Sequence, residues 1–289
     1  MRDGYALVTP ARNERANLER LAACVVAQRL TPAEWVIVDD GSDDGTEQLL
    51  AELAARHDWV RVVATGRDVD GIEQGRRRGR ALDAFRRGVA ALDGPVEVVV
   101  KVDADTSFEP DYFPELHARF RARPDLGIAG GACYELEDGD WRRRRVAGSH
   151  PRGASRAYRW ACLEQVMTLD SKMGWDGLDE VKVRMQGYRS QIFLDLGFRH
   201  HRATGGRDRS RLSHNEAQGA AAWYMGYRPT YLLLRTLYRA ATDPSAIGMA
   251  WGYFAAAARR EARCPDRAVV GHLRDEQRLR RVLRTGAPP

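Results

Sequence analysis

The first hundred residues alternate between short apolar segments and amphipathic ones, and this alternation limits the fold more than any other feature of the chain. Four apolar segments rich in β-branched residues predict strands, and three segments with apolar residues at helical spacing predict the helices between them. Such an order predicts a parallel sheet with right-handed crossovers and helices on both faces. The predicted strands are 5–8, 35–38, 60–64 and 96–102, and the predicted helices are 17–28, 43–56 and 78–92. We therefore expect an α/β fold with a mostly parallel, twisted sheet.

Polar residues follow the carboxyl ends of three of these strands, which is where open α/β sheets bind their ligands. Thr9–Glu14 follows the first strand, Asp39–Thr46 lies at the end of the second, and Asp103 and Asp105 follow the fourth. Residues separated by one position project to the same side of an extended chain, so Asp103 and Asp105 can hold one divalent cation through oxygen ligands. A cation held in this way suits a diphosphate. A solvated strand end is the plainer alternative.

The acidic pair Asp39–Asp40 points to a nucleobase. A carboxylate there can accept the imide N–H of uracil, which adenine and cytosine lack, or the corresponding donors of guanine, and the pair therefore favours uridine. The alternative is a turn with a helix N-cap, which accounts for Ser42 and Asp43 but not for the acidic pair. Farther along, Arg80 stands where a glycine turn meets a helix start and can bind phosphate, with a solvated basic face as the alternative.

Charge and cysteine content limit the partners and the compartment. The chain has 289 residues and a formal net charge of +6, which suits an anionic ligand or an acidic membrane surface. Its four cysteines form no Cys-x-x-Cys pair and predict reduced thiols in a cytosolic protein. The N-terminus lacks the apolar segment of a secretory signal, and no apolar run approaches the roughly 20 residues of a spanning helix. We expect a cytoplasmic protein without a transmembrane helix.

The second half contains acidic residues at a predicted helix start and a pair of histidines after a strand-like run. Asp176, Asp179 and Glu180 are three and four residues apart and project from one helical face, where one carboxylate can take a proton from an attacking nucleophile. The alternative is that these acidic residues only stabilise the helix, because the helix dipole favours negative charge at the N-terminus. His200 and His201 point to opposite sides of an extended chain, so at most one of them should bind a metal.

Four motifs in order resemble the pattern of the family-2 glycosyltransferases with the A-type fold. They are Val8–Glu14, Val36–Thr46, Gly79–Asp83 and Asp103–Asp105, and the likeness covers residues 5–205. The resemblance implies an inverting transferase that takes a sugar from a nucleotide diphosphate sugar. It also implies a divalent metal, manganese or magnesium, that bridges the diphosphate.

The same resemblance suggests which residues contact donor and metal. It implies that Asp105 binds the metal, that Asp103 lies near both ribose and metal, and that a histidine, His201 or His200, is a further ligand. The residues that we expect at the donor are Pro10, Arg12, Glu14, Asp39, Asp40, Arg80, Asp103 and Ala104.

The resemblance also bears on the general base. Related enzymes place a Glu-Asp pair about eleven residues before a Gly-aromatic step, and counting back from Gly187–Tyr188 reaches Asp176, with Trp175 in place of the usual glutamate. Asp176 is therefore the first choice for the base and Asp179 the second.

After residue 209 the composition changes, which predicts a catalytic domain over 1–209 and a C-terminal helical extension over 210–289. Segments 217–241 and 246–263 are helical by pattern, with breaks at Pro229 and Pro244, and 274–284 reads as a basic helix. An aromatic stripe that includes Tyr231 and Tyr238 runs beside arginines. It predicts either packing against the catalytic domain or a peripheral contact with an anionic membrane or acceptor.

These patterns together predict a metal-dependent, inverting glycosyltransferase that acts on a UDP sugar. The acceptor would be a hydroxyl or amine of a small molecule, a glycan or a lipid-linked compound. A non-catalytic nucleotide-sugar-binding protein and a sugar nucleotidyltransferase are the rivals. The nucleotidyltransferase, like a dinucleotide oxidoreductase, needs a glycine-rich turn where this chain has Thr9–Glu14. Nucleic acid is not expected as a partner, because the first half does not interleave basic residues with stacking aromatics.

Overall fold

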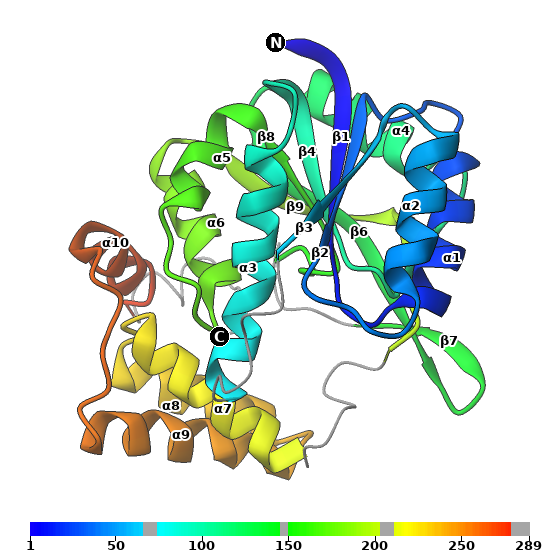
Figure 1. The fold of residues 1–289 in the computed structure, drawn as a ribbon. Coiled ribbons are helices and arrows are strands. Elements are labelled where there is room, and N and C mark those ends of the chain that lie inside the picture. The colour runs from blue at the N-terminus through cyan, green and yellow to red at the C-terminus, as the bar shows by residue number, and fades with distance from the viewer. Residues whose placement is uncertain (66–73, 145–149, 203–210, 279–289) are drawn as a thin grey trace. The chain divides into compact units, whose positions relative to one another are not determined.

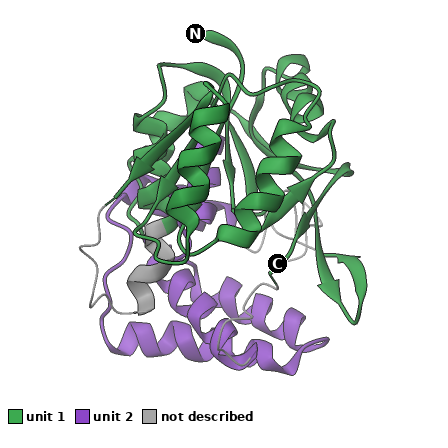
Figure 2. Cartoon of the chain, turned by 45° about the vertical axis from the view of Figure 1, so that its right-hand side comes forward, with its two compact units in different colours: residues 1–171, 187–203 green, residues 172–186, 204–289 purple. Residues whose placement is uncertain are grey.

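The computed structural model describes residues 1–65, 74–144, 150–202 and 211–278, apart from the side chains of 74–80 (Figure 1). The chain divides into two compact units (Figure 2). Unit 1 comprises Met1–Ser171 and Gly187–Ala203, and unit 2 comprises Lys172–Gln186 and Thr204–Pro289. The segment with Asp176 and Asp179 is thus grouped with the C-terminal helices. The functional boundary at residue 209 stays a prediction.

Unit 1 contains, within its described residues, a nine-stranded sheet in the order β3-β2-β1-β4-β8-β6-β9-β5, with β7 paired to β6. Parallel pairing joins β1 to β2 and β4, β2 to β3, and β6 to β9, while β8 lies antiparallel between β4 and β6. Six strands therefore run in one direction, which confirms the mostly parallel sheet. The strands are β1 (Arg2–Ala11), β2 (Glu34–Asp39), β3 (Val60–Ala64), β4 (Val96–Val102), β5 (Thr106–Phe108), β6 (Leu126–Glu137), β7 (Asp140–Arg143), β8 (Ser155–Arg159) and β9 (Arg189–His200).

Helices cover both faces of this sheet, as the alternation predicted. The helices of unit 1 are α1 (Arg15–Val26), α2 (Thr46–Arg56), α3 (Gln74–Ala90), α4 (Tyr112–Ala122) and α5 (Trp160–Met167). Figure 1 shows α1, α2 and α4 on one face and α3 and α5 on the other. On the second face α3 approaches the sheet closely at Gly88, where a Cβ would lie 2.3 Å from Val8 Cγ1.

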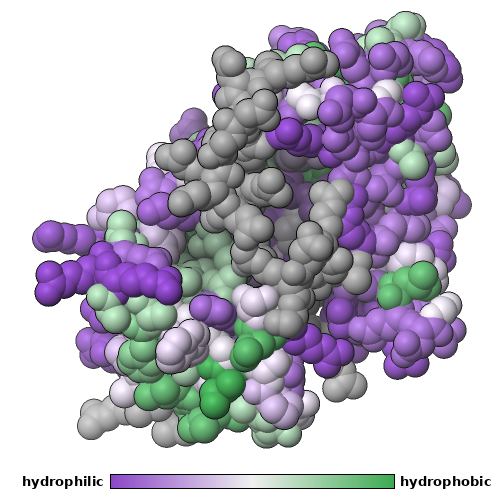
Figure 3. Space-filling model, turned by 60° about the horizontal axis from the view of Figure 1, so that its bottom comes forward, coloured by the Kyte–Doolittle hydropathy of each residue, from purple (hydrophilic) through white to green (hydrophobic). Residues whose placement is uncertain are grey.

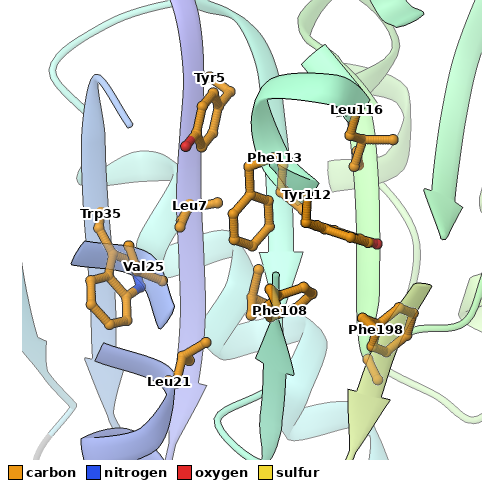
Figure 4. Close-up of a cluster of buried hydrophobic side chains, with 14 of the residues drawn as sticks. Tyr5, Leu7, Leu21, Val25, Trp35, Phe108, Tyr112, Phe113, Leu116 and Phe198 are labelled. Atoms are coloured by element: carbon orange, nitrogen blue, oxygen red, sulfur yellow. The ribbon is translucent and has the colours of Figure 1, made fainter. Parts of the chain in front are cut away.

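The main core lies between the sheet and α1, α2 and α4 (Figure 4). Alternate residues of β1, Tyr5 and Leu7, face this core, and Trp35 does so from β2. Tyr5 stacks on Phe113 of α4 with ring centroids 5.7 Å apart. Fully buried β-branched strands explain why the first half was predictable: all six residues of β2 are buried.

The paired glycines of β6 serve packing within the protein. Paired glycines in a strand can make room for a ligand, but here a Cβ on Gly131 would lie 2.1 Å from the Leu196 carbonyl oxygen and 2.7 Å from the Tyr112 ring. A Cβ on Gly130 would lie 2.6 Å from the Ser155 carbonyl oxygen. The groups that require glycine here are therefore neighbouring strands and a core tyrosine.

Unit 2 is helical in its described residues. It contains α6 (Trp175–Met185), α7 (Arg211–Tyr224), α8 (Pro229–Ala240), a short 3-10 turn at Pro244–Ala246, α9 (Ile247–Ala258) and α10 (Arg267–Glu276). The predicted breaks at Pro229 and Pro244 are confirmed. The predicted basic helix at 274–284 overlaps α10 only over residues 274–276, because α10 ends at Glu276. Residues 279–284 lie outside the described part of the chain.

Glycines allow α7 and α9 to cross closely. A Cβ on Gly219 would lie 2.0 Å from the Met249 carbonyl oxygen, and one on Gly252 would lie 1.9 Å from the Glu216 carbonyl oxygen. Salt bridges from Arg184 of α6 to Glu276 (2.8 Å) join α6 to α10. Among the described residues, none of the helices has the length and apolar character needed to span a membrane.

Candidate active site

The carboxyl ends of β1, β2 and β4 lie at one edge of the sheet of unit 1. In the parallel register Ala11 stands opposite Asp39, and Val8 stands opposite Lys101. The loops that begin at Arg12, Asp40 and Asp103 therefore leave the sheet side by side, as the sequence predicted.

Side chains tie the first two of these loops together. Asn13, at a left-handed φ of 54°, donates its backbone N–H to Ser42 Oγ (2.9 Å) and accepts from the Asp43 N–H at its Oδ1 (2.9 Å). The Ser42 hydroxyl and backbone N–H donate to Asp39 Oδ1 at 2.5 and 3.2 Å. Asp39 is buried and shapes this turn.

Asp39 and Asp40, the two candidate carboxylates for the nucleobase contact, differ in exposure. Asp40 is half-buried and accepts from Thr65 Oγ1 at 2.7 Å, so it is the more accessible of the pair. Pro10 lies in β1 opposite Val38, and Arg12 is exposed after the strand. The side chain of Arg80 lies outside the described residues.

Asp103 and Asp105 stand on either side of Ala104, which is buried in the core. Lys101, itself buried in β4, donates to Asp103 Oδ1 and to the Gly153 carbonyl oxygen (2.8 Å). The Asp103 side chain remains about one third exposed, whereas that of Asp105 is buried. The strand end thus presents one open and one enclosed carboxylate.

His200, the last residue of β9, connects Asp105 to a buried glutamate. Its Nε2 lies 3.3 Å from Asp105 Oδ1, and its Nδ1 lies 3.3 Å from Glu135 Oε1. Glu135 is fully buried and also accepts from Arg144 Nε (2.6 Å) and from an Arg152 guanidinium nitrogen (3.0 Å). The histidine therefore bridges two carboxylates.

Arg202 connects Asp105 to the loop after β1. Its guanidinium donates through both terminal nitrogens to the Glu14 carboxylate at 2.8 Å, and one nitrogen lies 3.2 Å from Asp105 Oδ2. A bidentate pair of this kind fixes the relative orientation of the two side chains as well as pairing their charges. Arg202 therefore links the carboxylates of Glu14 and Asp105, although 91 positions separate the two acids in the sequence.

The charges around Asp105 shift the pKa values of the site. Burial raises the pKa of Asp105, but the hydrogen bond from His200 and the charges of His200 and Arg202 leave it below its usual value. Burial lowers the pKa of His200, but its bonds to Asp105 and Glu135 raise it to about 9. His200 is therefore a charged imidazolium at neutral pH and must release a proton before it can bind a cation through nitrogen.

The second histidine has other partners. His201 Nε2 bonds to Ser107 Oγ (2.8 Å), and its ring packs edge-on to Trp141 with centroids 5.1 Å apart. Burial lowers its pKa. The two neighbouring imidazoles have separate surroundings, as expected of adjacent residues at a strand end, and His200 is the one beside Asp105.

The side chains of Asp103, Asp105 and His200 fit a hard divalent cation. One ligand atom from each lies within 4.8 Å of the others. Two carboxylates and one imidazole suit manganese or magnesium. Cys133, Glu135 and His200 are equally close, but burial raises the pKa of the Cys133 thiol to about 11 and two arginines already occupy Glu135. The first set is therefore the better candidate.

The two candidate bases lie in unit 2, on α6. Asp176 is half-buried in the first turn, after Gly174 with a left-handed φ of 96°. Asp179 is fully buried, and its Oδ1 accepts from the Glu180 backbone N–H at 2.6 Å. Asp176 is the more accessible carboxylate.

Sequence reasoning missed Lys101, Glu135 and Arg202. A lysine within an otherwise apolar strand was a usable signal for Lys101, since buried lysines need a partner. For Glu135, period-2 alternation places it on the same side of β6 as Cys133, at a buried position. Arg202 gave no signal, because nothing in sequence links it to Glu14.

Residues 6–175 match the family model described as "Glycosyl transferase family 2", which covers more than half of the chain. The chain belongs to glycosyl transferase family 2. Among curated proteins, this family member is 33% identical over 146 residues to the undecaprenyl-phosphate 4-deoxy-4-formamido-L-arabinose transferase of Pseudomonas aeruginosa strain LESB58. The match covers 49% of this chain and 39% of that protein. The chain thus spans about two fifths of the length of this relative.

Solved structures of nucleotide-sugar enzymes share the fold. A mannosyltransferase from Pyrobaculum calidifontis, in complex with GDP-Man and Mn²⁺, has a TM-score of 0.54 and 18% identity, over 98% of this chain and 83% of that one. TarS 1–349 from S. aureus, in complex with UDP-GlcNAc, has a TM-score of 0.53 and 16% identity, over 76% of this chain and 65% of that one. At these identities the likeness is one of fold. The A-type glycosyltransferase fold expected from the sequence is confirmed.

Proposed function

We propose that this family-2 member is an inverting, metal-assisted glycosyltransferase that uses a nucleotide diphosphate sugar, with a UDP sugar preferred. The observation that carries the proposal is the convergence of Asp103, Asp105 and His200 at the strand ends. Membership of the family and the nucleotide sugars named for the solved neighbours support the donor class.

Different residues of unit 1 are proposed to contact the nucleoside and the diphosphate of the donor. Pro10 at the end of β1 and the loops after β1 and β2, with Arg12 and Asp40, line the nucleoside, and Asp40 accepts the uracil imide N–H. Glu14 acts through Arg202, which holds the carboxylate of Asp105 in place. Arg80 is proposed to contact the diphosphate.

Asp103, Asp105 and His200 would hold a manganese or magnesium ion. When bound, such an ion stabilises the negative charge that develops on the leaving nucleotide diphosphate. Lys101 balances the charge of Asp103, and Glu135 holds the Nδ1 side of His200 so that its Nε2 faces Asp105.

Asp176 is proposed as the general base. It takes the proton of an acceptor hydroxyl or amine as that group attacks the anomeric carbon opposite the leaving diphosphate. Asp179 is the second choice, because it is buried and already accepts a backbone N–H.

The acceptor is a small molecule, a glycan or a lipid-linked compound. The name of the Pseudomonas relative, which includes undecaprenyl phosphate, supports the lipid-linked class. A cytoplasmic location is proposed as well. All four cysteines are free thiols, which accords with a reducing compartment.

Thermal-shift measurements test the donor. The diphosphates of uridine, guanosine, cytidine and thymidine are compared with and without manganese, because a ligand bound only by the folded state raises the melting temperature. We expect the largest shift with uridine diphosphate and manganese together. A shift with another nucleotide would refute the uridine assignment, and a nucleotide shift that is the same without manganese would refute the metal's role.

Variants test the mechanism. Asp105→Asn should remove the manganese-dependent part of the shift, whereas Asp176→Asn should keep that shift and lose sugar transfer by about 10²-fold or more. Nucleotide binding with no transfer to any acceptor would favour a binding protein. Formation of a sugar nucleotide from a sugar phosphate and a nucleoside triphosphate would favour a nucleotidyltransferase.

A further inference from the structure

Helix α8 turns leucines outward and arginines inward. Leu233, Leu237 and Tyr238 are exposed, with 70% of the Leu237 surface accessible, whereas Leu232 on the opposite side is fully buried. Arg239, also on the inner side, donates to Gln218 Oε1 at 2.9 Å, and burial lowers its pKa. A surface helix of a soluble protein normally shows the reverse arrangement.

Helix α9 has a second apolar stripe. Ile247, Trp251 and Phe254 follow each other at intervals of four and three residues and are exposed, with 68% of Trp251 accessible. Its other side, with Met249 and Tyr253, forms the small core of unit 2. The inward side of α9 is therefore already used, and the exposed stripe is additional to it.

The two stripes make up the apolar face of unit 2: Leu233, Leu237 and Tyr238 on α8, and Ile247, Trp251 and Phe254 on α9. The two helices pack against each other within this unit. Figure 3 shows apolar residues gathered on the surface in this region. Clustered exposed apolar residues of this kind mark an interaction site.

Charge identifies the partner. Unit 2 contains 18 Lys and Arg and 10 Asp and Glu, a formal charge of +8, while unit 1 contains 28 and 30, a charge of −2. All of the net positive charge thus belongs to the unit with the apolar face. Exposed Arg259 and Arg260 stand at the C-terminal end of α9. An apolar face on a positively charged unit complements an anionic lipid surface.

A second copy of the chain fits less well, because it would bring two units of charge +8 together. Tyr238 and Trp251 also favour lipid, since amphipathic rings of tyrosine and tryptophan concentrate at membrane interfaces. Within the described residues the helices of unit 2 are too short to span a bilayer. The arrangement is that of helices lying in the interface.

We propose that the apolar face of α8 and α9 docks unit 2 onto an anionic membrane surface. The docking does not depend on the proposed transfer reaction. It gives unit 2 a function besides carrying the candidate base, and it would bring the protein to lipid-linked acceptors if these are its substrates.

Vesicle sedimentation of the full chain tests this proposal. Vesicles of phosphatidylcholine alone are compared with vesicles that contain phosphatidylglycerol, at low and high salt and without nucleotide. We expect binding to the anionic vesicles and weaker binding at high salt. Leu237→Ser combined with Trp251→Ser should weaken binding about 10-fold or more, since each side chain loses the burial of a large apolar group.

The control is Leu194→Ser, which removes an exposed leucine (60% accessible) from β9 of unit 1 and should bind as the wild type does. Because these positions are on the surface, all variants should keep the melting temperature, and their nucleotide-dependent thermal shifts report on the proposed reaction separately. Unchanged vesicle binding in the double variant would overturn the proposal. So would absence of vesicle binding by the wild type, or a dimer in solution that the double variant dissociates.

Discussion

Replacing Glu135 with glutamine removes one negative charge from a fully buried position while keeping the shape of the side chain. The carboxylate accepts from Arg144 at 2.6 Å, from Arg152 at 3.0 Å and from His200 at 3.3 Å, so one anion serves three cationic groups. The amide keeps one acceptor oxygen, but it cannot balance their charge. We therefore expect this variant to lower the stability of unit 1 and to leave His200 less firmly oriented.

The size of the effect follows from burial. Breaking a buried ion pair by removing one partner costs about 3–5 kcal/mol, and the remaining amide oxygen favours the lower end, about 3 kcal/mol. In a domain of the size of unit 1 each kcal/mol lowers the melting temperature by about 2–4 °C, which gives a fall of about 6–12 °C. Loss of the group that orients a metal-binding histidine should also weaken manganese binding by about 10–100-fold.

Glu137→Gln is a matched control. Glu137 lies two residues along the same strand and also pairs with Arg144, at 2.6 Å, but its side chain is 38% exposed. An exposed pair contributes about 0–1 kcal/mol, so this variant should melt within about 4 °C of the wild type and bind manganese normally. Calorimetric melting and manganese titration measure both quantities. Equal melting temperatures and equal manganese affinities for the two variants would show that the buried network has neither of its expected roles.

Two further predictions concern packing. Gly252→Ala should destabilise unit 2 by about 1–3 kcal/mol, since the new methyl group would lie 1.9 Å from the Glu216 carbonyl oxygen, whereas Gly271→Ala, with no atom within 4 Å, should be neutral or stabilising. Thermal unfolding compares the two, and a Gly252 variant that melts with the wild type would contradict the close helix crossing. Tyr112→Phe should cost about 1–3 kcal/mol, because the Gly131 backbone N–H loses its 3.0 Å acceptor in a buried site; an unchanged urea midpoint would argue against that bond.

Patterns along the chain determined the fold of the first half and the place of the site. Strands such as β2 and β4 are buried on both faces, and such strands appear in a sequence as mostly apolar runs. Once the order of strands and helices is known, parallel pairing brings their carboxyl ends to one edge. Asp39, Asp40, Asp103 and Asp105 could therefore be grouped from sequence, because each follows directly from the end of a recognisable strand.

Only the tertiary structure decided which side chains meet there. His200 reaches Asp105 because β9 pairs with β5 and β6, and Glu135 reaches His200 because β6 places the two opposite each other in register. Arg202 joins Glu14 to Asp105 across long separations in the sequence. Strand pairing between distant segments depends on packing of the whole sheet, so no local pattern reports it. For the same reason the sequence indicated an aromatic stripe with Tyr231 and Tyr238, but only the packed helices showed that Tyr231 is half-buried while Leu237 and Tyr238 are exposed.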